Sequence, residues 1–345
     1  MRNEGLELTS DLSLLTSHFS LLREAKMVSG KAHGIPLHTY SIVAYDPDRR
    51  QWGVAVQSHY FNVGSIVPWA EAVVGAVATQ SMAEPSYGPL GLALMRAGKS
   101  APQALAALLQ ADPNAAVRQV AMIDAQGNTA AHTGDRCIPE AGHRTGPHYS
   151  VQANLMLKST VPAAMASAFE GASGDLDLAE RMLLVLEAAE AEGGDIRGKQ
   201  SAALLVVQGE LTGTPWASRP FDLRVDDHAE PLPELRRILA VTRAYRYADE
   251  AENVMGDRSL GEERFAAAAD LFQKALDQSW AMPGNMELLF WEAVALADNG
   301  RLDDALPLFR QAFAADPAWR ELVPRLVPIG RLHAHADVVR RITSA

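Results

Sequence analysis

Three consecutive segments decide the fold: Thr39-Tyr-Ser-Ile-Val-Ala-Tyr45, Asp46-Pro-Asp-Arg-Arg-Gln51 and Trp52-Gly-Val-Ala-Val-Gln57. The first and third are rich in β-branched and aromatic residues with alternating character, which is typical of strands. The middle segment consists of residues that favour turns. This order predicts a β-hairpin. Because so short a turn joins only antiparallel strands, we also expect a mainly antiparallel sheet.

The chain beyond the hairpin alternates between strand and helix patterns. Further strands are predicted over 73–80, 118–124, 129–133, 149–155, 202–208 and 221–225. Helices are predicted over 89–109, with a break near Gly98 and a new start at Ser100, and over 161–170 and 176–192. Two sheets, each covered by a pair of helices, would bury these apolar runs. We therefore expect a layered α+β domain over residues 39–230.

The strand pattern ends at Pro231, and we expect a helical segment over 231–345. Within it, Ala268, Phe272 and Ala275 recur 37 residues later as Ala305, Phe309 and Ala312. This spacing resembles the tetratricopeptide repeat, most clearly over 284–317. Two repeats are fewer than the three or so that stand alone, so we expect this segment to lean on the α+β domain.

Residues 1–38 form an N-terminal extension, which we expect to be helical or flexible. Ser10 or Asp11 could cap a helix with an apolar face made of Leu12, Leu15, Phe19 and Leu22, and 28–38 is typical of a flexible joint. The extension could also be an upstream addition, with Met27 as a rival start. Its acidic residues argue against a secretory signal peptide, so a cytoplasmic protein is expected.

The composition excludes several classes of function. Of 345 residues, 48% are hydrophobic and 21% are charged, as in ordinary globular proteins. The net charge of −11 disfavours nucleic acid as a partner, and no run of about 20 apolar residues indicates a membrane span. One cysteine, Cys137, excludes a disulfide scaffold. The common nucleotide, zinc-protease and serine-hydrolase motifs do not occur, so no cofactor is expected.

Polar residues gather where the predicted strands end. They include Ser58, His59, Gln80, Ser81, His132, Asn154, Arg197 and Gln200. Polar side chains on the ends of rigid strands are a common way to build a site. For each residue alone the alternative is a structural role, because Ser, Thr and Gln often end strands where the chain turns. Together they indicate a site built on the strand ends of the α+β domain.

Several motifs resemble one known family. They are Thr39-Tyr-Ser-Ile-Val-Ala, Trp52-Gly-Val-Ala-Val-Gln-Ser-His59, Pro85-Ser-Tyr-Gly-Pro89, His132-Thr-Gly134, Gly142-His143 and Arg197-Gly-Lys-Gln-Ser-Ala-Ala-Leu-Leu-Val206. Over about 39–245 the chain resembles the bacterial family called domain of unknown function 1028. The resemblance implies the fold of N-terminal nucleophile hydrolases, which is a four-layer αββα sandwich, and it leaves the activity open.

That fold implies a mechanism. In such hydrolases the first residue of the first strand attacks an amide carbonyl, and its own α-amine serves as the base. An α-amine has a pKa of about 7.7–8.0, so part of it is unprotonated at neutral pH. The resemblance places Thr39 in this role. Its amine must then be freed by cutting the His38–Thr39 bond, by the chain itself or by another protease. The alternative is that Thr39 is an ordinary strand residue.

The resemblance also suggests supporting roles. An oxyanion needs hydrogen-bond donors, for which Asn154 is the first candidate and Gln80 with Ser81 the second. Arg197 could clamp a substrate carboxylate, or it could instead form an ion pair with Asp195. The remaining strand-end residues are assigned to substrate binding: Ser58, His59, His132 and Gln200.

Three functions stay open. The first is hydrolysis of a small amide by Thr39. The second is a non-catalytic αββα scaffold whose helical repeats bind a peptide, a protein or a cell-wall partner. The third is a metal-dependent hydrolase in which Asp226, Asp227 and His228 act with His59 or His143, although a turn and salt bridges would explain the Asp-Asp-His run equally.

Two further expectations concern reactivity and assembly. Cys137, beside Arg136, could be a reactive thiol, or it could be buried and inert. A homo-oligomer is expected, since broad apolar sandwiches often dimerise.

Overall fold

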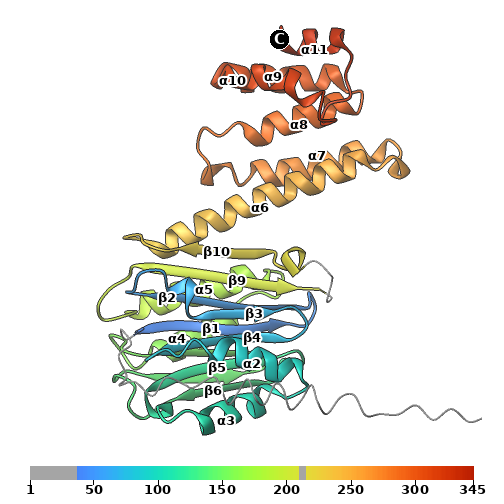
Figure 1. The fold of residues 1–345 in the computed structure, drawn as a ribbon. Helices are drawn as coiled ribbons and strands as arrows, with labels where there is room; N and C mark the ends of the chain where they lie inside the picture. The colour runs from blue at the N-terminus through green and yellow to red at the C-terminus, as the bar shows by residue number, and fades with distance from the viewer. Residues whose placement is uncertain (1–36, 210–214) are drawn as a thin grey trace, which may run out of the picture.

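Figure 1 shows the fold in a computed structural model, which describes residues 37–209 and 215–345. Two antiparallel sheets lie face to face, with helices on both outer faces, and a helical segment extends from one side. The six-stranded sheet has the order β10-β9-β2-β1-β8-β7 and the four-stranded sheet the order β3-β4-β5-β6. The predicted α+β fold is confirmed. The helix expected around Leu12–Leu22 lies outside the described residues.

The six-stranded sheet consists of β1 (Thr39–Asp46), β2 (Gln51–Ser58), β7 (Gly142–Gly146), β8 (Tyr149–Ala153), β9 (Ser201–Gln208) and β10 (Phe221–Val225). The four-stranded sheet consists of β3 (Pro68–Glu71), β4 (Gly75–Ser81), β5 (Arg118–Asp124) and β6 (Thr129–Thr133). The predicted hairpin is β1–β2, in which Thr39 lies opposite Ser58.

Helices cover both sheets. The six-stranded sheet packs against α4 (Val161–Gly171), α5 (Leu178–Glu192) and the start of α6 (Pro231–Gly256). The four-stranded sheet packs against α2 (Tyr87–Arg96) and α3 (Ala101–Ala111). The other helices are α7 (Glu263–Leu276), α8 (Glu287–Asp298), α9 (Leu302–Ala315), α10 (Ala318–Leu326) and α11 (Ala336–Thr343). Short 3-10 turns occur at Val63–Ser65, Ala115–Val117, Pro215–Ser218, Arg258–Leu260 and Ser279–Ala281.

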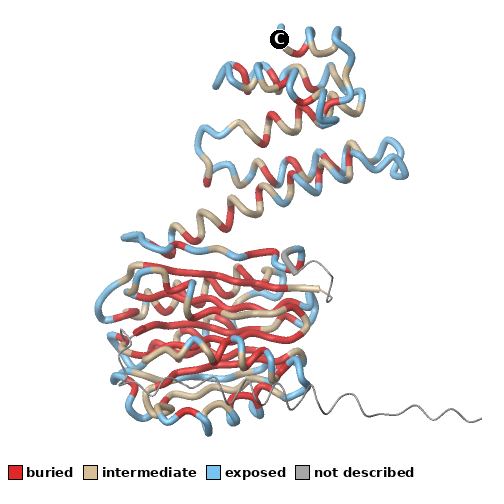
Figure 2. The backbone as a smooth tube through the Cα atoms, in the orientation of Figure 1, coloured by how far each residue is buried: buried red, intermediate tan, exposed pale blue. Residues whose placement is uncertain are grey.

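The buried residues concentrate in the two sheets (Figure 2). Successive residues of β1 point to opposite faces, as in any strand. Tyr40 and Ile42 join the apolar cluster beneath α4 and α5, whereas Val43 joins the cluster between the sheets. The same alternation sends Thr39 and Ser41 into the space between the sheets. The first polar residue of the hairpin is therefore an interior residue of the sandwich.

The helical segment leans on the sandwich, as expected. The first turns of α6 place Leu235 and Leu239 in the apolar cluster of the six-stranded sheet. Arg236 and Arg243 of the same helix form ion pairs with Glu180 of α5, at 2.6 and 2.8 Å. Farther along, the repeated sets are buried at equivalent positions of α7 and α9: Ala268, Phe272 and Ala275, then Ala305, Phe309 and Ala312. Within the described ranges, no helix combines the length and the apolar character needed to cross a bilayer.

Candidate functional site

Thr39 is buried at the start of β1, with an exposed fraction of 0%. Its Oγ1 donates a hydrogen bond of 3.2 Å to Oγ of Ser58, the residue opposite it in the hairpin. Ser58 Oγ donates in turn to the main-chain carbonyl oxygen of His38, at 2.6 Å. The Ser58 hydroxyl thus links the Thr39 hydroxyl to the carbonyl oxygen of the peptide bond that precedes Thr39.

A second donor reaches the same carbonyl. Arg197 Nη2 lies 3.0 Å from the His38 oxygen. The guanidinium is fixed by Asp195, whose two carboxylate oxygens accept from Nη2 at 2.7 Å and from Nε at 3.1 Å. The Asp195 side chain is fully buried and that of Arg197 is 29% exposed. The Arg197–Asp195 ion pair considered from the sequence therefore forms, and it aims the guanidinium at His38.

Gln80 and Asn154 hold the main chain of Thr39 from the other side. Gln80 Nε2 and the Asn154 main-chain N–H donate to the Thr39 carbonyl oxygen, both at 3.1 Å, and Asn154 Nδ2 donates to it at 3.4 Å. Asn154 Oδ1 lies 3.1 Å from His38 Nδ1. Since an amide oxygen only accepts, this contact places the proton of a neutral imidazole on Nδ1. Burial lowers the pKa of His38, which favours that neutral form.

Behind these groups lies Gln119, a residue that the sequence reasoning missed. Its Oε1 accepts from Gln80 Nε2 at 2.7 Å and from Asn154 Nδ2 at 2.9 Å, and its Nε2 donates to Thr133 Oγ1 at 2.9 Å. The available signal was a polar residue next to the apolar run Val120–Ile123 of β5, in the four-stranded sheet. A buried amide in such a position needs partners, so it indicates a polar network.

The other predicted site residues, which are His59, Ser81, His132 and Gln200, form their hydrogen bonds with groups other than Thr39. His132 Nε2 lies 2.8 Å from the Ala115 carbonyl oxygen. The Gln200 side-chain amide donates a hydrogen bond to Asp227 at the surface. The His59 side chain is exposed, while its main-chain N–H donates to Asp195. Ser81 is buried, and its main chain pairs with Leu37. The structure thus gathers Thr39, Ser58, Gln80, Asn154 and Arg197 around the His38–Thr39 bond.

In the Asp226-Asp227-His228 run, Asp227 and His228 form hydrogen bonds with neighbouring protein groups. Asp227 accepts from Gln200, and His228 Nδ1 accepts from the Glu230 main-chain N–H at 3.0 Å. In the part of the chain that the structure describes, no group of three or more His, Cys, Asp and Glu residues is placed to hold a metal. The run lies in the bend that joins β10 to α6.

Cys137 is buried, and its thiol lies 3.4 Å from the Arg118 carbonyl. Burial raises the pKa of this thiol, which favours the inert alternative.

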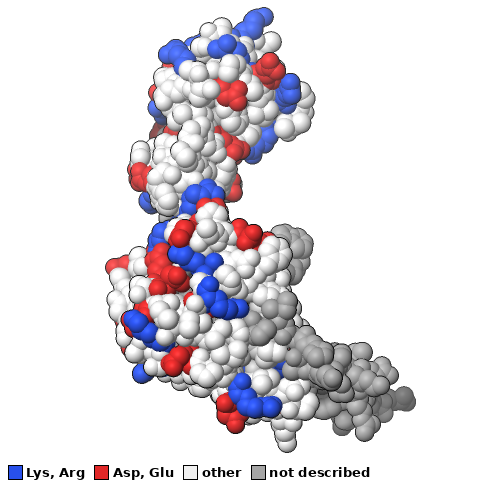
Figure 3. All heavy atoms as spheres, turned by 90° about the vertical axis from the view of Figure 1, so that its left-hand side faces the viewer, with Lys and Arg blue, Asp and Glu red and all other residues white. Residues whose placement is uncertain are grey.

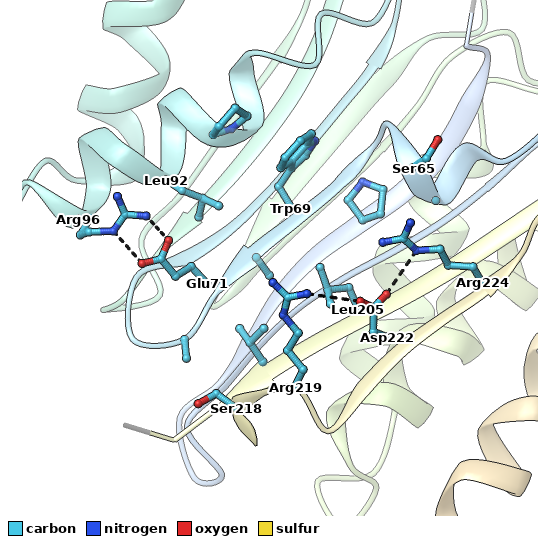
Figure 4. Close-up of a pocket in the computed structure, with 16 residues that line it drawn as sticks. Ser65, Trp69, Glu71, Leu92, Arg96, Leu205, Ser218, Arg219, Asp222 and Arg224 are labelled. Carbon is cyan, nitrogen blue, oxygen red and sulfur yellow. Dashed lines mark hydrogen bonds and ion pairs between the residues drawn. The ribbon is translucent and has the colours of Figure 1, made fainter. Parts of the chain in front are cut away.

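A cavity of about 700 Å³ lies elsewhere, between β3 with α2 and the β9–β10 edge (Figure 4). Trp69 and Leu205 line it, and Asp222 stands between Arg219 and Arg224 on one wall. The side chains that contact Thr39 do not line it. Thr39, Ser58, Gln80 and Asn154 are each 0% exposed, so the Thr39 site is closed in the intact chain. Its end of the sandwich faces the viewer in Figure 3, where acidic and basic side chains are interspersed.

The two sheets with helices on both outer faces define an αββα-sandwich protein. The equivalent buried sets of α7 and α9 define the tetratricopeptide-like segment that follows it. The chain belongs to the family of unknown function DUF1028, whose model matches residues 39–235, and a tetratricopeptide repeat model matches residues 259–325. It is similar to the DUF1028 protein SPO2555 from Silicibacter pomeroyi, for which a crystal structure is known. The two sequences are 30% identical, and the two folds superpose with a TM-score of 0.53. That match covers 59% of this chain and 84% of the other. No curated protein matches the chain. The resemblance drawn from the motifs is confirmed.

Proposed function

We propose that the protein is an amide-bond hydrolase whose nucleophile is Thr39, exposed by cleavage of the His38–Thr39 bond. The observation that supports this most is the convergence of Ser58 and Arg197 on the carbonyl oxygen of that bond, at 2.6 and 3.0 Å. Two donors on one carbonyl oxygen are what stabilises the negative charge of a tetrahedral intermediate. The Thr39 hydroxyl stands one hydrogen bond away from them.

The geometry favours cleavage by the chain itself. Thr39 Oγ1 attacks the His38 carbonyl carbon, its proton passes to Ser58 Oγ, and the Ser58 proton moves to the carbonyl oxygen. The carbon–nitrogen bond then breaks, the nitrogen takes up that proton, and an ester joins His38 to Thr39 Oγ1. Water hydrolyses the ester to a His38 carboxylate and a free Thr39 with its amine and hydroxyl. Another protease would give the same product.

The freed amine would then act as the base for external substrates. The Arg197 guanidinium lies next to the carbonyl that this amine leaves behind, and a nearby positive charge disfavours the protonated amine. Asp195 partly offsets this effect. In this scheme Ser58 and Arg197 take the oxyanion role first assigned to Asn154. Asn154 and Gln80 instead hold the Thr39 main chain in place.

The test is the intact mass and the N-terminal residue of the purified protein after incubation at neutral pH. The proposal expects a chain that begins at Thr39, and amidase activity in that chain only. A chain that stays full length would leave cleavage to another protease. If a chain produced with Thr39 as its first residue also hydrolyses no amide, the proposal is wrong.

The helical segment favours a second role, which does not depend on Thr39. Arg331, in the connection after α10, lies with its guanidinium over the Trp291 ring of α8, 5.2 Å from the centroid. The same side chain pairs with Glu252 of α6 at 2.8 Å. Glu287, which accepts from Tyr245, lies one turn before Trp291 on α8. Since this face already holds an arginine, we propose that it binds an arginine-bearing segment of a partner protein.

This second role is tested by calorimetry with a short arginine-containing peptide. Arg331→Ala frees the face and is expected to raise the affinity, whereas Trp291→Ala in the Arg331→Ala background is expected to abolish binding. Equal binding by all three chains would contradict this role.

A further inference from the structure

The two residues before Thr39 fill a cleft in the sandwich. Leu37 pairs with Ser81, the last residue of β4, through two main-chain hydrogen bonds of 2.8 and 2.9 Å. The Leu37 side chain is 3% exposed and belongs to the apolar cluster between the sheets. His38 follows, also buried, with its carbonyl held by Ser58 and Arg197.

The cleft exists because β3, which begins at Pro68, leaves Ser81 at the end of β4 without a β3 partner. Pairing between these strands stops at Pro68 opposite Ala78, so Ser81 lies beyond it with an open edge, while β5 occupies the other side of β4. Leu37 takes this open place. Ser81 has a φ of 68°, an uncommon conformation for a residue other than glycine. Strained backbone of this kind tends to occur at functional sites.

Cleavage before Thr39 would empty this cleft, so the present inference rests on the proposed function. We propose that the emptied cleft binds the acyl side of the substrate, and that the substrate is a peptide or peptide-like amide in extended conformation. Ser81 would pair with its main chain, as an open strand edge pairs with an added strand. The Leu37 site would take an apolar side chain, two residues before the scissile bond. Ser58 and Arg197 would hold the scissile carbonyl.

The charges and hydrogen-bonding groups of the cleft favour this class over others. Arg197 is already paired with Asp195, so it offers no unbalanced charge to a substrate carboxylate. A small primary amide would leave both main-chain groups of Ser81 unpaired and the Leu37 site unfilled, and both are unfavourable. Asn154 Oδ1 accepts a hydrogen bond from the residue next to the scissile bond, as it does from His38.

The experiment measures binding apart from catalysis. The protein is a chain of residues 39–345 with Thr39→Ala, and the probe is acetyl-Ile-Pro-Leu-His-amide, which copies residues 35–38. Every described strand begins at Thr39 or later, and the family match also begins there, so this chain keeps the sandwich. Calorimetry is expected to show binding that falls about 10- to 100-fold when the leucine of the peptide is replaced by aspartate. N-methylation of that leucine, which removes the donor to Ser81, is also expected to weaken binding.

The full-length chain with Thr39→Ala is the matched control, because it has no nucleophile with which to cleave itself and its own Leu37 fills the cleft, and it is expected not to bind. The full-length chain with Leu37→Asp and Thr39→Ala frees the Leu37 site but keeps His38 in place, and it is expected to bind the peptide more weakly than the 39–345 chain. Equal affinity for the leucine and aspartate peptides, or no binding by either open chain, would overturn the inference. Binding without hydrolysis of the matching anilide by a chain that begins with Thr39 would instead count against the proposed function.

Discussion

Ser58 Oγ donates a hydrogen bond of 2.6 Å to the main-chain carbonyl oxygen of His38. Ser58 reaches this carbonyl because the register of the β1–β2 hairpin places it opposite Thr39. A shift of one residue would turn Ser58 to the helix-covered face of the sheet. The pattern that specifies the hairpin therefore also assembles the hydroxyl pair of the site.

The hydroxyl of Thr39 is the first target. Thr39→Val keeps the β-branched shape but removes Oγ1, and it is expected to abolish both cleavage before residue 39 and amidase activity. Thr39→Ser restores a hydroxyl and is expected to restore both. Mass spectrometry of the incubated proteins measures the cleavage. Cleavage of the valine variant by itself would show that Thr39 is not the nucleophile.

Removal of one carbonyl donor should slow cleavage without unfolding the protein. Ser58→Ala leaves Arg197 as the remaining donor to the His38 oxygen, and the rate is expected to fall about 100- to 1000-fold. The control is Ser150→Ala, since Ser150 is a buried serine of the same sheet whose hydroxyl donates to Gln152. Time courses followed on gels compare the two. Equal rates would remove Ser58 from the mechanism.

The contact between α5 and α6 should weaken in acid. Burial alone would raise the pKa of Glu180, but hydrogen bonds from Arg243 and Arg236 outweigh it and hold the pKa below its ordinary 4.5. A lowered pKa contributes stability above about pH 4.5, and this contribution is lost as the pH falls through the lower folded value. Glu180→Gln is expected to lower the free energy of unfolding by about 1–2 kcal/mol at pH 7 and to flatten its pH dependence below 4.5.

Urea unfolding between pH 3 and 7 measures this effect. Glu192→Gln serves as the control, because Glu192 lies at the end of the same helix and pairs with Lys158 rather than with α6. The same pH dependence in wild type and Glu180→Gln would contradict the role given to Glu180.

The two repeat helices should respond alike to loss of their aromatic residue. Phe272 and Phe309 are buried at equivalent positions, and the Phe309 ring packs against Phe290 and Phe313. Phe272→Ala and Phe309→Ala are each expected to destabilise the helical segment by about 3–5 kcal/mol. Phe61→Ala is the control, because Phe61 is 61% exposed. Far-ultraviolet circular dichroism during urea unfolding would show a sizeable early helical loss in both variants. If either matched the control, the repeat would not be a structural equivalence.

The sequence predicted the central strands well because apolar side chains alternate along them. The edge strands β3 and β7 were not predicted. β7 reads Gly-His-Arg-Thr-Gly and is largely exposed, so it lacks an apolar pattern. It is a strand because it pairs with β8, and β3 similarly depends on its pairing with β4. Such strands are set by tertiary contacts, which a local pattern does not record.

The residues of the candidate site also divide into those that the local sequence predicts and those that only the tertiary structure places. Thr39, Ser58 and Arg197 stood out as polar residues at strand ends or in a glycine-rich loop. The glycine and proline before Leu37 and His38 predict a flexible joint, yet both residues are buried. What orders them is the open edge at Ser81, a feature of two strands of unequal length. No local pattern around Leu37 encodes that edge.

Gln119 connects the halves of the site and carries the last prediction. Gln119→Leu keeps the volume but removes the acceptor of Gln80 and Asn154 and the donor to Thr133. The unpaired amides are expected to lower the free energy of unfolding by about 2–4 kcal/mol, and cleavage before Thr39 should slow because Asn154 and Gln80 hold its main chain. Gln51→Leu breaks a partly buried amide pair with Gln208 at the opposite end of the hairpin. It is expected to destabilise the protein without slowing cleavage. Equal slowing by both variants would show that Gln119 acts on stability alone.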